Sequence, residues 1–142
     1  MAVKFNYQIE NFRIKNSARI KDWLEKVIKR EGFNLGDLIF IFTDDNFIIE
    51  INREFLENDY STDVIAFNYS DGKNINAEIY VGLETVYRNA RILGEKRRDE
   101  LYRVMVHGLL HILGYDDKKR EDRIRMRERE NEYMEKIVDN EF

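Results

Sequence analysis

Residues 107–117 read His107-Gly108-Leu109-Leu110-His111-Ile112-Leu113-Gly114-Tyr115-Asp116-Asp117 and contain both histidines of the chain. Two histidines four residues apart on a helix lie on the same face, about one turn apart. That spacing allows two imidazoles to bind one metal ion. Because the chain has no cysteine and no third histidine, a third protein ligand would have to be a carboxylate. Asp116 and Asp117 follow directly after Gly114.

The helix that carries this pair is expected to run from Arg97 to about Leu113. Its C-terminal half is apolar on nearly every side, which predicts that this end is buried. Burial disfavours the charged imidazolium, so both histidines are expected to be neutral and able to bind a metal. Gly114 can reverse the chain after the helix, and this turn would bring an aspartate back toward the imidazoles.

The histidine pair also has other interpretations. A buried histidine is usually a hydrogen-bonded core residue, and a His-x-x-x-His pair also arises by chance. Two histidines and one carboxylate leave an open position on zinc, as catalytic sites do, and the same ligands suit iron, nickel or manganese. The metallopeptidase motif His-Glu-x-x-His places its general base where this chain has Gly108. A zinc-peptidase mechanism would therefore lack its base.

The composition is that of a soluble globular protein. The chain has 142 residues, of which 43% are hydrophobic and 37% charged, and this length predicts one domain over residues 1–142. No apolar run approaches the ~20 residues that span a membrane, and residues 1–7 show no signal peptide. The lack of cysteine excludes a disulfide framework. We expect a cytoplasmic protein with no membrane partner.

Hydrophobic periodicity and capping residues predict the secondary structure. Strands are expected at residues 5–9, 37–43, 63–69 and 77–81. Helices are expected from Asn16 or Ser17 to Gly32, from Asp44 or Asp45 through Phe55, and at about 83–93, 96–112 and 117–138. This order predicts an α+β fold, with one mixed sheet of about four strands, helices packed on it and the metal site at the end of a helix.

Three blocks of the sequence resemble the YbeY family, bacterial metal-dependent endoribonucleases of rRNA maturation. Residues 107–117 resemble the family signature His-Gly-x-Leu-His-Leu-x-Gly-Tyr-Asp-His. Ile51-Asn52 with Thr62–Phe67 is similar to the family's Leu-Asn and Thr-Asp-Val-Leu-Ser-Phe, and Ala77–Val81 is similar to its Gly-Asp-Ile-x-Ile strand. The blocks occur in the family's order and imply a single YbeY-like domain.

The resemblance implies one zinc ion per chain, held by three side chains. The first two ligands carry over onto His107 and His111, and the family's third histidine falls on Asp117. An aspartate can bind zinc, so we expect a His-His-Asp site, and other divalent metals also fit. The aspartate lowers the net positive charge of the bound metal and makes it a weaker Lewis acid.

The resemblance also implies a substrate site, from which this chain departs at Leu56. The family has an arginine there, suited to binding phosphate, and Arg53, one helical turn earlier, is the candidate substitute. Thr62 and Asp63 are candidate substrate-binding residues, although the pair could simply begin a strand. No residue is a convincing general base, and Asp116 and Asp63 are the candidates.

RNA binding requires cationic contacts to phosphates, and a net charge of −4 leaves only local patches to provide them. The candidate patches are residues 96–98 and the run 118–129. Acidic residues interrupt the second run, a pattern typical of a solvated helix face. The expected partners are rRNA and ribosomal components, and no DNA is expected.

The leading hypothesis is a single-strand-directed, metal-dependent endoribonuclease of rRNA maturation and ribosome quality control. The first alternative is a ribosome-assembly or rRNA-binding factor with a structural metal and little catalysis, which Leu56 favours. The second is a zinc-dependent hydrolase of another substrate class, against which Gly108 argues.

Overall fold

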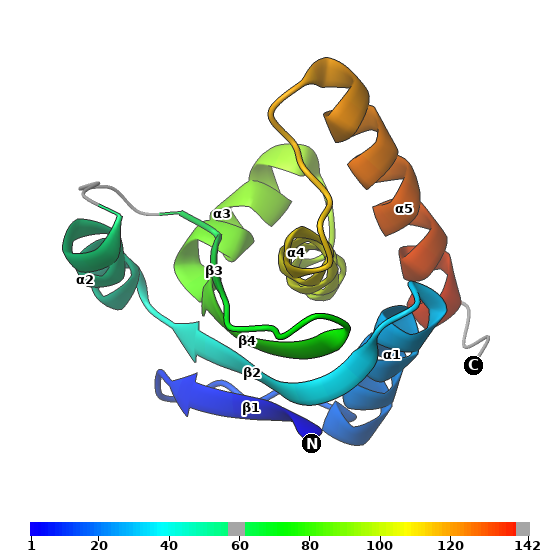
Figure 1. Ribbon diagram of the computed structural model, residues 1–142. Helices are drawn as coiled ribbons and strands as arrows, with labels where there is room; N and C mark the ends of the chain where they lie inside the picture. Colours follow the sequence, from blue (N-terminus) through cyan, green and yellow to red (C-terminus); the bar gives the residue numbers. More distant parts are fainter. Residues whose placement is uncertain (57–61, 139–142) are drawn as a thin grey trace.

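The computed structural model describes residues 1–56 and 62–138, and their elements form one mixed sheet with helices packed on it (Figure 1). In chain order these elements are β1 (Ala2–Gln8), α1 (Ser17–Arg30), β2 (Asn34–Thr43), α2 (Asp45–Phe55), β3 (Val64–Asn68), β4 (Asn74–Gly82), α3 (Leu83–Leu93), α4 (Arg97–Ile112) and α5 (Arg120–Val138). The strand order is β1-β2-β4-β3, in which only the edge strand β3 runs antiparallel to its neighbour. The predicted α+β fold is confirmed.

Several element boundaries differ from the prediction. Strands β2 and β4 begin at Asn34 and Asn74, each three residues earlier than predicted. Strand β1 begins at Ala2 rather than residue 5, because Ala2 already pairs with Asp37 of β2. Helix α5 begins at Arg120, after a loop that occupies the start of the predicted helix. Asn16 precedes α1 in a left-handed conformation with φ of 56°. Its side chain makes no capping hydrogen bond to any described residue.

Helix α4 lies at the centre of the structure. It contacts α3, α5, β3 and β4, and its apolar side chains share one core with α1 and with the facing sides of the strands. Helix α2 packs on the opposite face of the sheet, where Ile48 and Ile51 meet Ile65 of β3. The C-terminal half of the helix that carries both histidines is buried, as predicted, and the burial extends over most of the remaining helix.

Gly108 allows α4 to lie close to the sheet. A Cβ atom at this position would lie 3.0 Å from Cγ2 of Ile79 and 3.1 Å from Cγ2 of Val64. The glycine is therefore explained by tight packing against β4 and β3. No helix in the described ranges is long and apolar enough to cross a membrane.

Candidate metal centre

The structure brings the three predicted ligands together. His107 and His111 lie one turn apart on α4 with ring centroids 4.7 Å apart. Oδ2 of Asp117 lies 3.6 Å from Nε2 of His107 and 3.2 Å from Nε2 of His111. Ligand atoms bonded at about 2.0–2.1 Å to a tetrahedral ion lie about 3.3 Å from one another. These three side chains therefore have the spacing and the chemistry to hold one metal ion.

A sharp turn after α4 brings Asp117 back to the histidines. Gly114 has a φ of 106°, which an L side chain rarely adopts. Its N–H donates to the carbonyl of His111 at 3.1 Å, and the N–H of Tyr115 donates to the carbonyl of Leu110 at 3.0 Å. These bonds end the helix and reverse the chain.

The Asp116 carboxylate stabilises this loop rather than facing the histidines. Its Oδ1 accepts hydrogen bonds from the backbone N–H of Asp117 at 2.7 Å and of Lys118 at 3.2 Å. Among the described residues, Asp116 lines neither of the cavities beside the candidate metal centre. The structure thus separates this candidate general base from the site.

Side chains from two helices anchor the same loop. The Tyr115 hydroxyl donates to Oε1 of Glu31 at 2.6 Å and accepts from Nε of Arg129 at 3.0 Å. The Tyr133 hydroxyl donates to the other oxygen of Glu31. The position of Asp117 therefore depends on the end of α1 and on α5.

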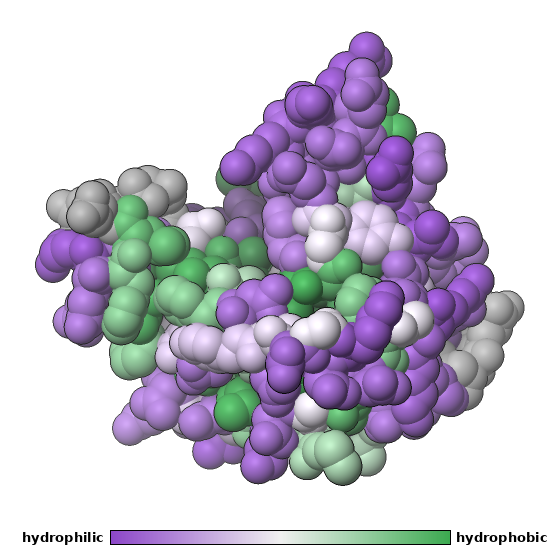
Figure 2. Space-filling view, viewed as in Figure 1, coloured by the Kyte–Doolittle hydropathy of each residue, from purple (hydrophilic) through white to green (hydrophobic). Residues whose placement is uncertain are grey.

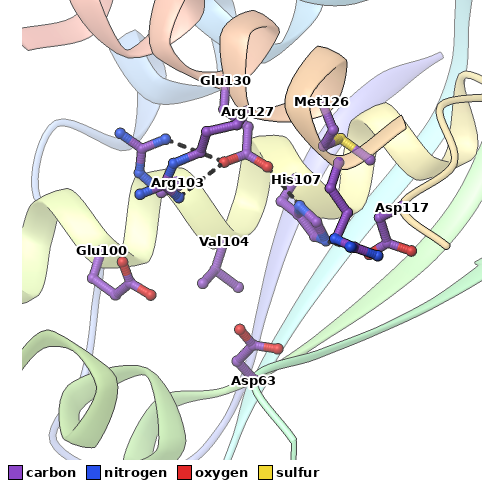
Figure 3. A pocket seen from close by; sticks show the side chains of 10 residues that line it. Asp63, Glu100, Arg103, Val104, His107, Asp117, Met126, Arg127 and Glu130 are labelled. Carbon is purple, nitrogen blue, oxygen red and sulfur yellow. Dashed lines mark hydrogen bonds and ion pairs between the residues drawn. The ribbon is translucent and has the colours of Figure 1, made fainter. Parts of the chain in front are cut away.

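The Glu130 carboxylate of α5 hydrogen-bonds with Nδ1 of His107, the ring nitrogen that faces away from Asp117 (Figure 3). Its Oε2 lies 2.6 Å from Nδ1 of His107, and its Oε1 accepts from Nη1 of Arg103 at 3.1 Å. Its side chain is only 5% exposed. When Nδ1–H donates to this carboxylate, Nε2 is left as the acceptor on the side of Asp117.

Glu130 is not among the predicted site residues, because it lies in the mixed-charge run that is typical of a solvated face. One signal was available. Glu130 shares a helical spacing with the buried residues Met126, Tyr133 and Ile137, which marks the side of α5 that faces the core.

Charged neighbours of His107 counteract the effect of burial on its pKa, on which the expectation of a neutral ring rests. Burial lowers the pKa of His107, but the hydrogen bond and charge of Glu130 and the charges of Asp63 and Asp117 raise it further, so the net shift is upward. Burial raises the pKa of Glu130, but its bonds to His107 and Arg103 hold it below the ordinary value. The upward shift depends on the Glu130 carboxylate of α5, and the burial of His107 alone does not reveal that this carboxylate is beside the ring.

Two cavities meet at the candidate metal centre, and Asp63, His107 and Asp117 line both. The larger cavity, about 490 Å³, lies beside β3 and is also lined by Leu56 and Thr62. Figure 2 shows the surface hollowed between α2 and the projecting end of α5. The smaller cavity, about 270 Å³, lies between α4 and α5.

Some of the other predicted substrate-binding residues line the two cavities, and one does not. The Thr62 hydroxyl donates to Oδ1 of Asp63 at 3.4 Å, so these two residues lie together at the site. Arg53 is exposed on α2 and is not among the described residues that line either cavity. Arg123 and Arg127, from the basic run, line the smaller cavity.

Comparison with known proteins confirms the resemblance to the YbeY family. The family model described as Endoribonuclease YbeY matches residues 4–138. The Endoribonuclease YbeY of Flavobacterium psychrophilum is 41% identical over 93% of this chain and 94% of its own length. That of Amoebophilus asiaticus is 44% identical over 87% of this chain and 84% of its own.

A solved structure shares this fold. The solution structure of a Thermotoga maritima protein superposes with a TM-score of 0.68 at 28% identity, covering 99% of this chain and 91% of that one. The chain therefore belongs to the YbeY family, whose curated members are named endoribonucleases.

Proposed function

We propose that this protein is a metal-dependent endoribonuclease that cleaves single-stranded regions of rRNA during its maturation. His107, His111 and Asp117 would hold one zinc ion. The observation that carries the proposal is the convergence of these three side chains where two cavities meet. Ribosomal components are the proposed partners and the cytoplasm is the proposed location.

The ligand set suits zinc, because two imidazoles and one carboxylate leave a coordination position open. A divalent ion held there would supply Lewis-acid chemistry to a phosphodiester. Glu130 orients the His107 ring through Nδ1. Asp117 adds a negative charge, which moderates that Lewis acidity.

Asp63 is the candidate general base that the geometry favours. Its carboxylate lines both cavities, together with His107 and Asp117. A base must lie within reach of the proton it accepts. The position of Asp63 in the walls of both cavities supports this role if an RNA strand passes through them. Asp116 is held by backbone N–H groups instead.

The phosphate contact that Leu56 cannot make is proposed to come from α5. Leu56 is 45% exposed and forms an apolar wall of the larger cavity. Arg123 and Arg127 line the smaller cavity, and guanidinium groups suit phosphate oxygens. The proposal therefore places the phosphate contacts across the metal centre from the position of the family arginine.

The Asp117→Ala variant tests the proposal through metal content and RNA cleavage. The wild-type protein should hold about one zinc ion per chain, because two histidines and Asp117 complete the ligand set. It should also cleave single-stranded RNA. Asp117→Ala should lose both properties while it keeps the circular dichroism spectrum of the wild type. Asp22→Ala is the matched control, because Asp22 is 53% exposed on α1.

Three outcomes would contradict the proposal. Asp117→Ala that cleaves RNA without bound metal would remove the metal from the mechanism. A wild-type protein that holds zinc and hydrolyses casein but not RNA would be a hydrolase of another class. A wild-type protein that binds rRNA, does not cleave it and unfolds without metal would be an assembly factor with a structural ion.

A further inference from the structure

Glu100 is a buried carboxylate at the start of α4, and the candidate metal centre does not use it. The residue is 7% exposed, and it lies two helical turns, roughly 10 Å, before His107. Among the described residues, no side chain hydrogen-bonds or ion-pairs with its carboxylate. Burial and the charge of Asp63 raise the pKa of Glu100 above the ordinary value.

The carboxylate of Glu100 faces the smaller cavity (Figure 3). In this view Glu100 lies at one end of the cavity and Asp117 at the other, with Asp63 on the opposite wall. The Glu100 oxygens are not fully enclosed, since Thr43 Oγ1 is the one fully enclosed side-chain polar atom without a partner among the described residues. They lie at a cavity wall, where a ligand could provide hydrogen-bond donors.

The other walls of this cavity combine apolar and cationic side chains. Val104 of α4 and Met126 of α5 are buried and apolar. The Arg127 side chain is 60% exposed, and Arg123 donates to the backbone carbonyl of Lys118 at 2.8 Å. The cavity walls thus combine apolar side chains, guanidinium groups near solvent and four carboxylates, those of Asp63, Glu100, Asp117 and Glu130. Of these four, Glu130 also has its Oε1 at 3.6 Å from Nη1 of Arg127.

We propose that this cavity binds one nucleotide of the RNA beside the cleaved bond. Glu100 would accept hydrogen bonds from N–H groups of the base, while Arg123 and Arg127 face its phosphate. The cavity of about 270 Å³ is slightly smaller than the ~300–1,000 Å³ of most small-molecule sites. This inference rests on the proposed nuclease function, and it adds a subsite that reads the base.

The position of the cavity supports this assignment. An RNA strand that crosses the candidate metal centre from the larger cavity enters the smaller one, because Asp63, His107 and Asp117 line both. Single-stranded bases are read along their hydrogen-bonding edges while their faces pack on side chains. Val104 and Met126 provide the packing surface, and Glu100 provides the contact to the edge.

The chemistry of a carboxylate predicts which base binds best. A carboxylate has two acceptor oxygens and no donor. Guanine presents two adjacent N–H donors on its Watson–Crick edge, whereas uracil presents one donor between two carbonyls that a carboxylate repels. Guanine should therefore bind most tightly and uracil most weakly. A glutamine offers one donor and one acceptor, which suits adenine.

The experiment measures binding of the four nucleoside 5′-monophosphates to the full chain by calorimetry, with zinc and again with a chelator. The wild-type protein should bind GMP about tenfold more tightly than UMP, as expected for a two-bond contact. Glu100→Gln should lose most of this preference and gain relative affinity for AMP. Glu95→Gln, an exposed residue before α4, should behave as the wild type does.

A second variant tests the phosphate contact without changing a buried residue. Arg127→Gln should reduce the difference in affinity between GMP and guanosine, since it removes a cation facing the phosphate. It should leave the preference for guanine over uracil unchanged. Equal effects on GMP and guanosine would place Arg127 outside the phosphate contact.

Two outcomes would overturn the subsite. One is equal affinity of the wild-type protein for all four nucleotides. The other is a divalent cation bound between Glu100 and Asp63, detected by paramagnetic line broadening with Mn²⁺ that Glu100→Gln removes. Base-selective binding that persists with chelator, in a protein that does not cleave RNA, would contradict only the proposed nuclease function.

Discussion

The negatively charged side chain of Glu130 is buried between α4 and α5. A buried charge needs partners within the protein because it has lost its contact with water. His107 and Arg103 are those partners, at 2.6 Å and 3.1 Å from its two oxygens. The bond to His107 also selects the ring nitrogen that faces Asp117. One side chain therefore balances charge and orients a proposed metal ligand.

The Glu130→Gln variant should weaken zinc binding about 10- to 100-fold, the usual effect of losing a carboxylate partner of a ligating histidine. Glutamine keeps the size of the side chain but removes the charge that makes the imidazole a stronger ligand. Competition with a chromophoric chelator measures the affinity. Glu128→Gln, exposed on the same helix, is the control, and equal affinity in both variants would show that Glu130 serves packing alone.

The sequence identified those site residues whose own spacing carries the signal. His107 and His111 follow from helical geometry, and Asp117 follows from the glycine turn and the family resemblance. Glu100 and Glu130 could not be predicted in the same way. Charged residues are usually exposed. The helical spacing of Glu130 with apolar residues hints at its burial, but only the packing of the helices shows which groups these two carboxylates face.

Glu100 should make the stability of the protein depend on pH. Its neighbours with charge are Asp63 before β3, Arg103 on α4, and Arg127 and Glu130 on α5, and the net effect with burial is a raised pKa. A raised pKa means that the folded state holds this proton more tightly than the unfolded state does. The contribution of Glu100 to stability therefore falls as the pH rises above its ordinary pKa of 4.5.

The Glu100→Gln variant removes the decrease in stability that Glu100 causes as the pH rises. Its melting temperature should exceed that of the wild type near neutral pH, and the difference should shrink as the pH falls toward about 4. Thermal melts over this pH range measure the effect, with Glu95→Gln as the control. A variant that is less stable than the wild type at neutral pH would show that the folded protein already pairs this carboxylate.

At the scale of the elements, local sequence patterns predicted the helices and strands but not how these elements pack together. Period-two and helical patterns predicted all nine described elements. Between β3 and β4, the backbones of Asp71 and Asn74 hydrogen-bond to each other in a tight turn, which accounts for the antiparallel pairing of these strands. The patterns did not give the strand order, or the position of α2 on the opposite face of the sheet. Both depend on contacts between residues far apart in the chain.

The turn after α4 depends on Gly114. Gly114→Ala forces an L residue to a φ of 106°, which should destabilise the fold by about 1–3 kcal/mol. It should also weaken zinc binding, because the turn positions Asp117. Chemical denaturation and zinc titration measure the two effects.

Gly94→Ala is the matched control for this variant. Gly94 has a φ of 69° at the end of α3, and neither glycine has a neighbour within 4 Å of an added Cβ. Gly94→Ala should therefore lose stability but keep its zinc affinity. Equal loss of zinc affinity in both variants would mean that general destabilisation, not the turn, controls the metal centre.

Across the whole molecule, the candidate metal centre connects the central helix to the rest of the fold. The loop that carries Asp117 is tied through Tyr115 to Glu31 at the end of α1 and to Arg129 on α5. Trp23 of α1 also donates to the backbone carbonyl of Tyr133 on α5 at 3.0 Å. A ligand that joins α4 to this loop should therefore stabilise the molecule as a unit.

This coupling predicts that zinc raises the melting temperature of the full chain. At a free zinc concentration of 100 times the dissociation constant, the stabilisation is about 2.7 kcal/mol, which corresponds to roughly 5–10 °C for a chain of this length. Asp117→Ala should melt at the same temperature with and without zinc, since its third ligand is gone, whereas Asp22→Ala should keep the full shift. A zinc-dependent shift that survives in Asp117→Ala would place the stabilising ion elsewhere. If the wild-type protein held zinc but its melting temperature did not change, the unfolded chain would have to bind the ion as tightly as the folded one. Two histidines and an aspartate could do so only if folding added nothing to their geometry.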